Sequence, residues 1–194
     1  CQIMNVSIGR VVTHEDVVQI KELQTANLGR NLPDDIKTKE GFVTAEYTVE
    51  FLERMNSLCP SIVARNDTGH IVGYIMVVTK ELCLEHSLLT DLYQAFAKIP
   101  FKNKLLEDVN LVIVGQVCVA DGYRGQGLVY KMYNYYKQCL SSTYDGAITD
   151  VATSNPRSLA AHLKSGFKII HTIPYDGLEW HIILWDWRDD TEAP

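Results

Sequence analysis

The feature that most constrains the fold of this chain is a strand-like run at residues 110–120 that leads through closely spaced glycines into a helix-like segment. Nearly every residue of the run is β-branched or apolar, as expected for a strand that is covered on both faces of a sheet. Gly115 interrupts its middle, where a glycine indicates a β-bulge. A strand at residues 147–151 then follows a helical stripe of Val129, Met132, Tyr133, Tyr136 and Leu140. The pattern predicts a β-turn-α-β unit and therefore an α/β protein.

Local signals predict further helices and strands around this unit. Residues 13–16, with Thr first and Asp last, are a helix-start signal. The turn formers at residues 66–69 lie between two apolar runs and predict an antiparallel hairpin. Asn155 and Pro156 begin another helix, which Gly166 is placed to end. Further helices are expected around residues 51–58 and 88–99, a loop at 29–43, and strands at 5–12, 61–65, 70–78, 167–173 and 179–187.

Composition fits one domain. The chain has 194 residues, of which 46% are hydrophobic and 22% are charged, a balance that allows a substantial buried core. No repeat, low-complexity tract or linker divides it. The expected fold is a single α/β domain over residues 1–194, in which helices flank both faces of a mixed central sheet of about six to seven strands.

Charge, hydropathy and cysteine usage exclude several classes of function. The net charge of −6 and the scattered basic residues argue against a nucleic-acid surface, and an acidic surface attracts cationic substrates instead. No apolar stretch approaches the ~20 residues that cross a bilayer, so no membrane association and a cytoplasmic location are expected. Five cysteines without a C-x-x-C pair indicate neither a disulfide framework nor a zinc site, and no metal is expected.

Closely spaced glycines before a helix can bind an anion. Glycines let the backbone approach a ligand, and the first N–H groups of a helix point outward without internal acceptors. A pyrophosphate fits such a place. A P-loop is excluded because no Gly-Lys-Ser/Thr follows, and the dinucleotide pattern G-x-G-x-x-G is absent. A tight connection that binds nothing stays open on this segment alone.

The segment resembles the coenzyme A motif of the GNAT superfamily, R/Q-x-x-G-x-G/A. Arg124 and Gly127 match two of its three defining places, and Val129 replaces the usual small residue at the third. The resemblance implies a GNAT-like fold, and it is carried by residues that lie directly after the buried strand.

A second segment, residues 155–167, is similar to the later motif of the same family, N-x-x-A-x-x-L-Y-x-K-x-G-F. Four of its places match, with Asn155, Lys164, Gly166 and Phe167. Three depart, since Ser158 stands for Ala, Ala161 for Leu and His162 for Tyr. The two motifs follow each other in the order that the family has.

The resemblance implies acetyl-CoA as the cofactor and indicates which residues hold it. In this family two neighbouring parallel strands part, here residues 111–119 and 146–152, and the pantetheine arm inserts between them. The implied cofactor-binding residues are the main chain of Val117, Cys118 and Val119, the N–H groups of Arg124, Gly125, Gln126, Gly127, Leu128 and Val129, and the side chain of Asn155, for which helix capping is the alternative.

The family's chemistry is direct attack of an uncharged amine on a thioester, which needs a base and a proton donor. His162 occupies the place of the family's donor Tyr and is the candidate general acid, with a helix-surface histidine as the alternative. Gln116 cannot accept a proton at neutral pH, so Glu179 and His181 are the candidate bases, with ordinary outward-facing residues as the alternative. Cys118 is expected to be inert packing.

Three hypotheses about function follow. The first is an acetyl-CoA-dependent N-acetyltransferase that acts on a primary amine of a small molecule or peptide. The second is a non-catalytic module that binds acyl-CoA for sensing, suggested by Val129, Gln116 and the missing Tyr. The third is an α/β protein without a cofactor. The expected partner is an amine-bearing small molecule or peptide, and a homodimer stays open.

Overall fold

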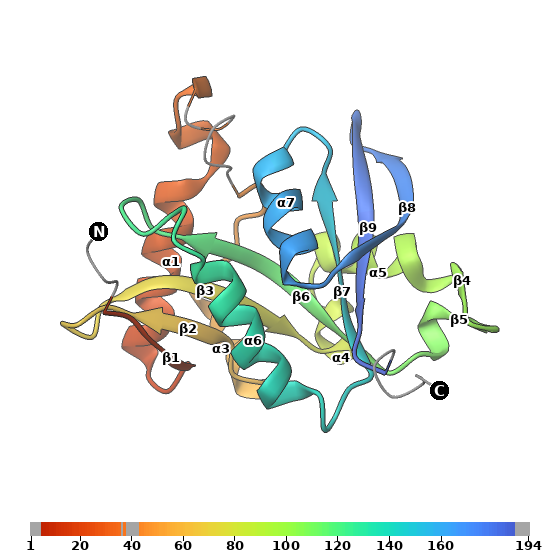
Figure 1. Cartoon of the computed structure of the whole chain (residues 1–194), viewed down its shortest axis with the longest axis horizontal. Coiled ribbons are helices and arrows are strands. Elements are labelled where there is room, and N and C mark those ends of the chain that lie inside the picture. The colour runs from red at the N-terminus through yellow and green to blue at the C-terminus, as the bar shows by residue number, and fades with distance from the viewer. Residues whose placement is uncertain (1–4, 36, 38–42, 189–194) are drawn as a thin grey trace.

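The computed structural model describes residues 5–35, 37 and 43–188 and is built around a seven-stranded sheet (Figure 1). The strands lie in the order β1-β2-β3-β6-β7-β9-β8, and every neighbouring pair is antiparallel except β6 with β7. The prediction of a mixed α/β sheet is confirmed. The strands are β1 (Ser7–Arg10), β2 (Ile62–Arg65), β3 (Ile71–Val78), β6 (Leu111–Val119), β7 (Gly146–Ala152), β8 (Lys168–Tyr175) and β9 (Leu178–Asp186).

Helices cover both faces of the sheet, as expected. Two buried apolar clusters separate the faces, since alternate residues of the strands belong to different clusters. One face packs against α6 (Leu128–Leu140) and α7 (Pro156–Ser165), which lie in front of the sheet in Figure 1. The other face packs against α1 (His14–Asn27), α3 (Val49–Leu58), α4 (Lys80–Cys83) and α5 (Ser87–Ala97).

Local signals in the sequence set most element boundaries. Thr13 caps α1 through a capping box with Asp16, as predicted. Gly166 ends α7 with φ of 125°, a conformation that a side chain disfavours. Asn155 stands at the start of α7 but makes no side-chain cap bond. The sequence did not predict α4, the small hairpin of β4 (Pro100–Phe101) and β5 (Lys104–Leu105), or the short helices η1 (Gly29–Asn31) and η2 (Leu106–Asp108).

The bulge predicted at Gly115 is present in β6. Ile75 of β3 pairs with Val117 and Val77 pairs with Val114, so β6 carries one residue more than β3 over this stretch. Before the bulge, even-numbered residues such as Val112 face α6, and after it Val119 does. The extra residue therefore reverses which face each later side chain takes.

β6 and β7 part beyond their first residues. Their register pairs only Leu111–Ile113 with Gly146–Ile148, although β7 continues to Ala152. A last link is the Thr149 hydroxyl, which donates to the Val114 carbonyl at 2.8 Å. Beyond it, no described residue pairs as a strand with the main chain of β6 on the β7 side, so the expected parting of residues 111–119 from 146–152 is confirmed.

Some expectations lie outside the described residues. These are part of the loop expected at residues 29–43 and the first of the five cysteines, Cys1. Within the described part, no helix has the length and apolar character that spanning a membrane requires.

Candidate functional site

Two cavities open at the place where β6 and β7 part. The first, here called the glycine-turn cavity, has a volume of about 400 Å³ and lies between the start of α6, the end of β6 and α7. The second, the hairpin cavity, has a volume of about 280 Å³ and lies between α5, the β8–β9 hairpin and the same two strands. Four residues line both cavities, namely Val43, Val117, Ser158 and His162. The cavities therefore adjoin at the opening in the sheet.

The glycine turn presents open backbone to its cavity. Gly122, Gly125 and Gly127 have φ of 85°, 73° and 76°, in the region that favours glycine. A Cβ built on Gly122 or Gly127 would have no atom within 4 Å, so the space beside the backbone is empty. Gly127 is the N-cap residue of α6, and no side chain accepts a capping hydrogen bond there in the described structure. The first N–H groups of the helix have no acceptor within the helix. This is the geometry of an anion site.

The charges around the glycine-turn cavity also suit an anion. Arg124, Arg157 and Lys164 line it, and no Asp or Glu does among the described residues. The Arg124 side chain is partly committed to the fold, since its Nε donates to the Val119 carbonyl at 2.9 Å and its Nη2 donates to Asn27 Oδ1. It fixes the turn against β6 and the end of α1, which leaves Arg157 and Lys164 as the more adaptable cations.

Most of the expected cofactor residues gather at this cavity. Gln126 does not line it, and its side-chain amide donates to the Gly122 carbonyl at 3.2 Å. Asn155 is buried in the lining of the hairpin cavity instead. Burial raises the pKa of the Cys118 thiol to about 12, so a thiolate is scarce and the thiol is inert. The residues in the lining are Val117, Cys118, Val119, Arg124, Gly125, Gly127, Leu128 and Val129.

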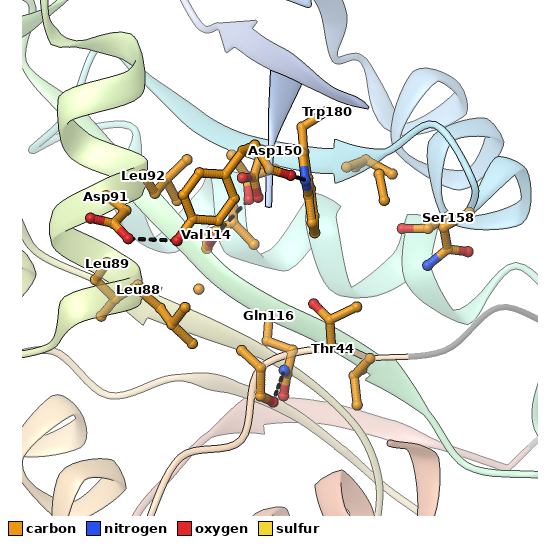
Figure 2. Close-up of a pocket in the computed structure, with 18 of the residues that line it drawn as sticks. Thr44, Leu88, Leu89, Asp91, Leu92, Val114, Gln116, Asp150, Ser158 and Trp180 are labelled. Atoms are coloured by element: carbon orange, nitrogen blue, oxygen red, sulfur yellow. Dashed lines mark hydrogen bonds between the residues drawn. The ribbon is translucent and has the colours of Figure 1, made fainter. Parts of the chain in front are cut away.

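The hairpin cavity is built from segments that are far apart in the sequence (Figure 2). α5 supplies Asp91, whose carboxylate accepts a hydrogen bond from the Tyr175 hydroxyl of the hairpin at 2.5 Å. β7 supplies Asp150, and β9 supplies Trp180, whose indole N–H donates to the Tyr175 carbonyl at 3.2 Å. Asp176 completes the hairpin side. Among the described residues, this lining contains aspartates but no Glu, Lys or Arg.

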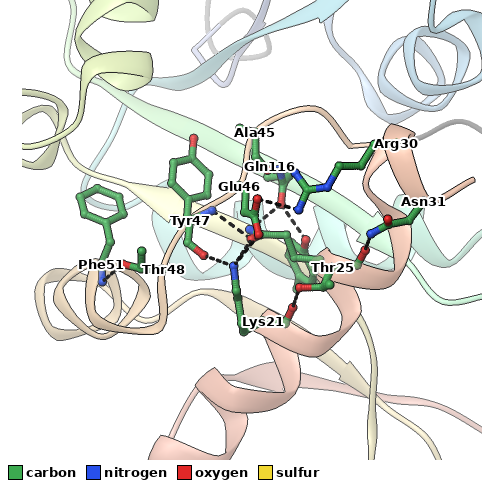
Figure 3. Close-up of polar contacts among 12 residues, drawn as sticks. Lys21, Thr25, Arg30, Asn31, Ala45, Glu46, Tyr47, Thr48, Phe51 and Gln116 are labelled. Carbon is green, nitrogen blue, oxygen red and sulfur yellow. Dashed lines mark hydrogen bonds and ion pairs between the residues drawn. The ribbon is translucent and has the colours of Figure 1, made fainter.

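The segment at residues 43–47 walls the hairpin cavity, and side chains of α1 and β6 hold it (Figure 3). The Gln116 amide donates to the Ala45 carbonyl at 2.8 Å, and its oxygen accepts from the Tyr74 hydroxyl at 2.7 Å and from Gln24 Nε2 at 3.2 Å. Lys21 Nζ donates to the Tyr47 carbonyl at 2.8 Å. Gln116, at the bulge, is therefore a structural tie between β6, β3, α1 and this segment.

His162 lies where the two cavities adjoin. Its side chain is buried, with 3% of the residue exposed, so it is not a surface histidine. Nδ1 is 2.7 Å from the Ser158 carbonyl oxygen, which can only accept, so Nδ1 carries the proton. Nε2 has no hydrogen-bond partner among the described residues. Burial lowers the pKa of the imidazole to about 4, which keeps it neutral at neutral pH.

Replacing His162 with Phe should make stability less sensitive to acid. As the pH falls from 6.5 towards 4, the unfolded chain binds a proton at His162 that the folded protein does not, so folded stability is lost in this window. The loss is on the order of 3 kcal/mol at about 1.4 kcal/mol per pKa unit. Urea unfolding at about pH 7 and about pH 5 should show a smaller decrease for His162→Phe than for wild type.

The exposed His171 on β8 provides the matched control. His171→Phe should leave the decrease of stability between the two pH values as it is in wild type, because it makes the same replacement at an exposed place and leaves the buried His162 unchanged. An equal decrease in wild type and His162→Phe would contradict the assignment of a neutral, buried His162.

Asp150 is the residue of the site that the sequence did not reveal. It lies near the middle of β7, where its neighbours in the strand are buried, and its side chain lines the hairpin cavity. No other described residue gives its carboxylate a hydrogen bond or an ion pair, and burial raises its pKa to about 6. A lone charged residue in a strand of otherwise uncharged residues was the signal in the sequence, because taking a charge out of water is costly without a function or a partner.

The structure does not bring the two expected bases to either cavity. Glu179 is exposed at the tip of the β8–β9 hairpin. His181 is half-buried, and its Nδ1 lies 2.8 Å from the Thr172 hydroxyl of β8. Trp180, between them in β9, does line the hairpin cavity, so strand alternation turns its two neighbours to the opposite face. Within the described part of the chain, no cluster of His, Cys, Asp and Glu could hold a metal ion.

Comparisons with known proteins agree with this geometry. The sequence matches the model of the acetyltransferase (GNAT) family over residues 30–167. No curated protein matches it. Among solved structures, it is similar to an acetyltransferase of the GNAT family from Streptococcus agalactiae, with 16% identity, a TM-score of 0.62, and coverage of 93% of this chain and 95% of that one.

Two further solved structures hold a ligand. Arabidopsis thaliana NAA60 in complex with acetyl-CoA is 13% identical, with a TM-score of 0.61 and coverage of 93% of this chain and 99% of that one. A phosphinothricin acetyltransferase from Sinorhizobium meliloti in complex with acetyl-CoA is 17% identical, with a TM-score of 0.63 and coverage of 98% and 94%. At these identities the likeness concerns the fold.

The family model spans more than half of the chain, including the glycine turn and the segment that begins at Asn155. The fold, the parted strands and the open helix start support the same assignment independently. The chain belongs to the acetyltransferase (GNAT) family.

Proposed function

We propose that this protein transfers an acetyl group from acetyl-CoA to a primary amine of a small molecule or peptide by direct attack. One observation carries the proposal: a cavity lined by cations and a cavity lined by carboxylates adjoin at the opening between β6 and β7. The first suits a phosphate-bearing cofactor, and the second suits a cationic amine. Their contact at Val117, Ser158 and His162 is where the two reacting groups would meet.

The residues around the glycine turn fit coenzyme A. The N–H groups at the start of α6, from Leu128 on, and those of the turn before it would hold the pyrophosphate, and Arg157 and Lys164 would balance phosphate charge. The main chain at residues 117–119, which no described strand pairs with on the β7 side, would hold the pantetheine arm. Asn155, buried beside Ser158, would meet the arm close to its thiol end.

When bound, the acetyl thioester supplies the electrophilic carbon. The chain's own residues would then align the amine, keep water away and move one proton. The main chain of Val117 is the candidate for orienting the acetyl group, because it lines both cavities. No enzyme nucleophile is needed, which is consistent with the inert thiol of Cys118.

The general-acid role expected for His162 stays a prediction. It requires the imidazolium form, because the Nδ1 proton is committed to Ser158 and Nε2 carries a proton only in that form. With a pKa of about 4, this form is scarce at neutral pH. In its neutral form, His162 offers Nε2 as an acceptor to whichever ligand group reaches the place where the cavities adjoin. The pH dependence of turnover in His162→Phe separates the two roles.

The proposed function is tested by the release of free thiol from acetyl-CoA over a panel of primary amines, with coenzyme A binding measured by calorimetry in parallel. We expect binding and amine-dependent thiol release. Binding without release on any amine would favour the acyl-CoA-binding module instead, and no binding would contradict both. The peptide or small-molecule nature of the amine, the cytoplasm as compartment and a homodimer remain predictions.

A further inference from the structure

We propose that Asp150 is the catalytic base of this chain, and that the hairpin cavity selects amines that carry positive charge and no carboxylate. The inference rests on the proposed function. It begins from the geometry of the hairpin cavity, where Asp150 projects from β7 on the side opposite to Gln116 and Thr44 (Figure 2).

The three residues weighed as bases in the sequence, Gln116, Glu179 and His181, are occupied or lie outside the cavities. Gln116 uses its amide group to hold Ala45, Tyr74 and Gln24, and an amide is no base at neutral pH. Glu179 and His181 line neither cavity. Asp150 is thus a carboxylate that lines the cavity, adjoins the opening between the strands and has no commitment to another described residue.

The surroundings of Asp150 are suited to a base. Its strand neighbours Thr149 and Val151 are buried, and burial raises its pKa to about 6, close to neutral pH. Asp150 pairs with Ile182 of β9. Trp180, two residues before Ile182, is therefore the diagonal neighbour of Asp150 on the same face of the sheet. The face of an indole attracts a cationic amine. An ammonium group beside Asp150 would therefore meet both a carboxylate and an aromatic ring.

Several elements that wall the cavity place titratable groups around Asp150. Among the described residues, none of these groups is a Lys or Arg. Burial, and after it the charge of Asp150, raises the pKa of the Tyr47 hydroxyl. The hydrogen bond to Asp91 is the main cause that raises the pKa of the Tyr175 hydroxyl, and Asp150 adds a smaller contribution, so neither phenol ionises near neutral pH. A carboxylate on the acceptor would meet only like charges here, whereas a second ammonium would meet further aspartates. The groups are Tyr47 on the 43–47 segment, Asp91 on α5, His162 on α7, and Tyr175 and Asp176 on the hairpin.

The reaction step balances with Asp150 as the only base. The carboxylate takes one proton from the ammonium group, and the freed nitrogen pair forms a bond to the acetyl carbon. The carbon–sulfur bond breaks, its electron pair goes to sulfur, and the sulfur takes the second proton that the nitrogen loses. Asp150 then gives its proton to water. The products are an amide, a free thiol and one proton, and no oxidant or further reactant is needed.

Thiol release by wild type and Asp150→Asn tests the base. In wild type, kcat/KM should fall below a pH of about 6, where a protonated Asp150 can no longer accept a proton. In Asp150→Asn, kcat/KM should be at least about 100-fold below that of wild type, and its pH profile should lack this acidic limb. The variant should bind coenzyme A as wild type does and unfold at no lower temperature, because Asn removes a charge from a half-buried place where no other described residue pairs with it.

Asp176→Asn is the matched control for charge, since Asp176 lines the same cavity and its φ of 51° suits Asn. This variant should raise KM for a diamine severalfold and keep the acidic limb. If Asp150→Asn retains the limb or more than a tenth of kcat/KM, Asp150 is not the base. If wild type itself releases no thiol with any amine, the proposed function fails, and the base role fails with it.

Amine selection is tested with diaminopropane, propylamine and β-alanine, which have chains of similar length and differ in charge. We expect kcat/KM to decrease in that order, with β-alanine at least tenfold below propylamine. Calorimetric titration of the three amines without acetyl-CoA should give the same order of affinity. Equal kcat/KM for propylamine and β-alanine would overturn the proposed selection of amines but would leave the proposed role of Asp150 as base unaffected.

Discussion

A carboxylate placed at position 129 is expected to weaken coenzyme A binding by about 100-fold while leaving the fold intact. Val129 is the second residue of α6 and lines the glycine-turn cavity. In Val129→Asp, the new charge would lie beside the proposed pyrophosphate, and a repulsion of roughly 3 kcal/mol corresponds to this loss. The same charge should stabilise the free protein by up to about 1 kcal/mol, because it lies at the positive end of the helix dipole.

Calorimetry with coenzyme A and urea unfolding of the free protein measure the two effects separately. Val129→Asn is the control of equal size without charge, and Val129→Ala restores a small residue of the kind the family motif has. Both should bind coenzyme A within about tenfold of wild type. The decisive result is that Val129→Asp weakens coenzyme A binding but increases the stability of the free protein. An affinity of Val129→Asp equal to that of Val129→Asn would show that no phosphate lies at the start of α6.

Gly166→Ala is expected to cost about 3 kcal/mol or more in the free energy of unfolding. A Cβ at this position would lie 2.5 Å from Nε1 and 2.9 Å from Cε2 of Trp185, and the backbone has φ of 125°. Trp185 packs against Tyr133 and Phe167, so its indole cannot move without disturbing the core behind α6. The cost combines overpacking with an unfavourable backbone conformation.

Gly69→Ala separates these two contributions. Gly69 also has positive φ, at 83°, but a Cβ there would meet no atom within 4 Å. We expect its cost to be about 1 kcal/mol, from the backbone alone. Urea unfolding of both variants gives the difference. Equal costs would contradict the close contact between Gly166 and Trp185.

The sequence predicted those features that local signals determine. The capping box at Thr13, the bulge at Gly115 and the end of α7 at Gly166 each depend on a few neighbouring residues. The short elements between α5 and β6 were missed, because segments of two or three residues carry too little periodicity to detect. The opening between β6 and β7 came from the family resemblance, since no local pattern indicates where paired strands part.

The acceptor side of the site was beyond the sequence for a different reason. Asp150 belongs to the site only because α5, the 43–47 segment and the β8–β9 hairpin meet around it, and these are contacts between distant segments. Strand alternation could have placed Glu179 and His181 on one face of β9, but the sequence could not say which face borders the cavity. Trp180 occupies that face, and nothing in the sequence distinguishes it from Trp185 of the same strand.

The bulge of β6 has a consequence for how this protein tolerates change. The additional residue at the bulge determines to which face of the sheet each side chain points between Gly115 and the glycine turn. Removal of Gly115 would therefore move each of these side chains to the opposite face. Gln116 and Val117 would then point to the wrong sides of the sheet, and both cavities would lose a wall together. Over this stretch, a substitution leaves each side chain on its side of the sheet, whereas adding or removing one residue would rebuild the walls of both cavities.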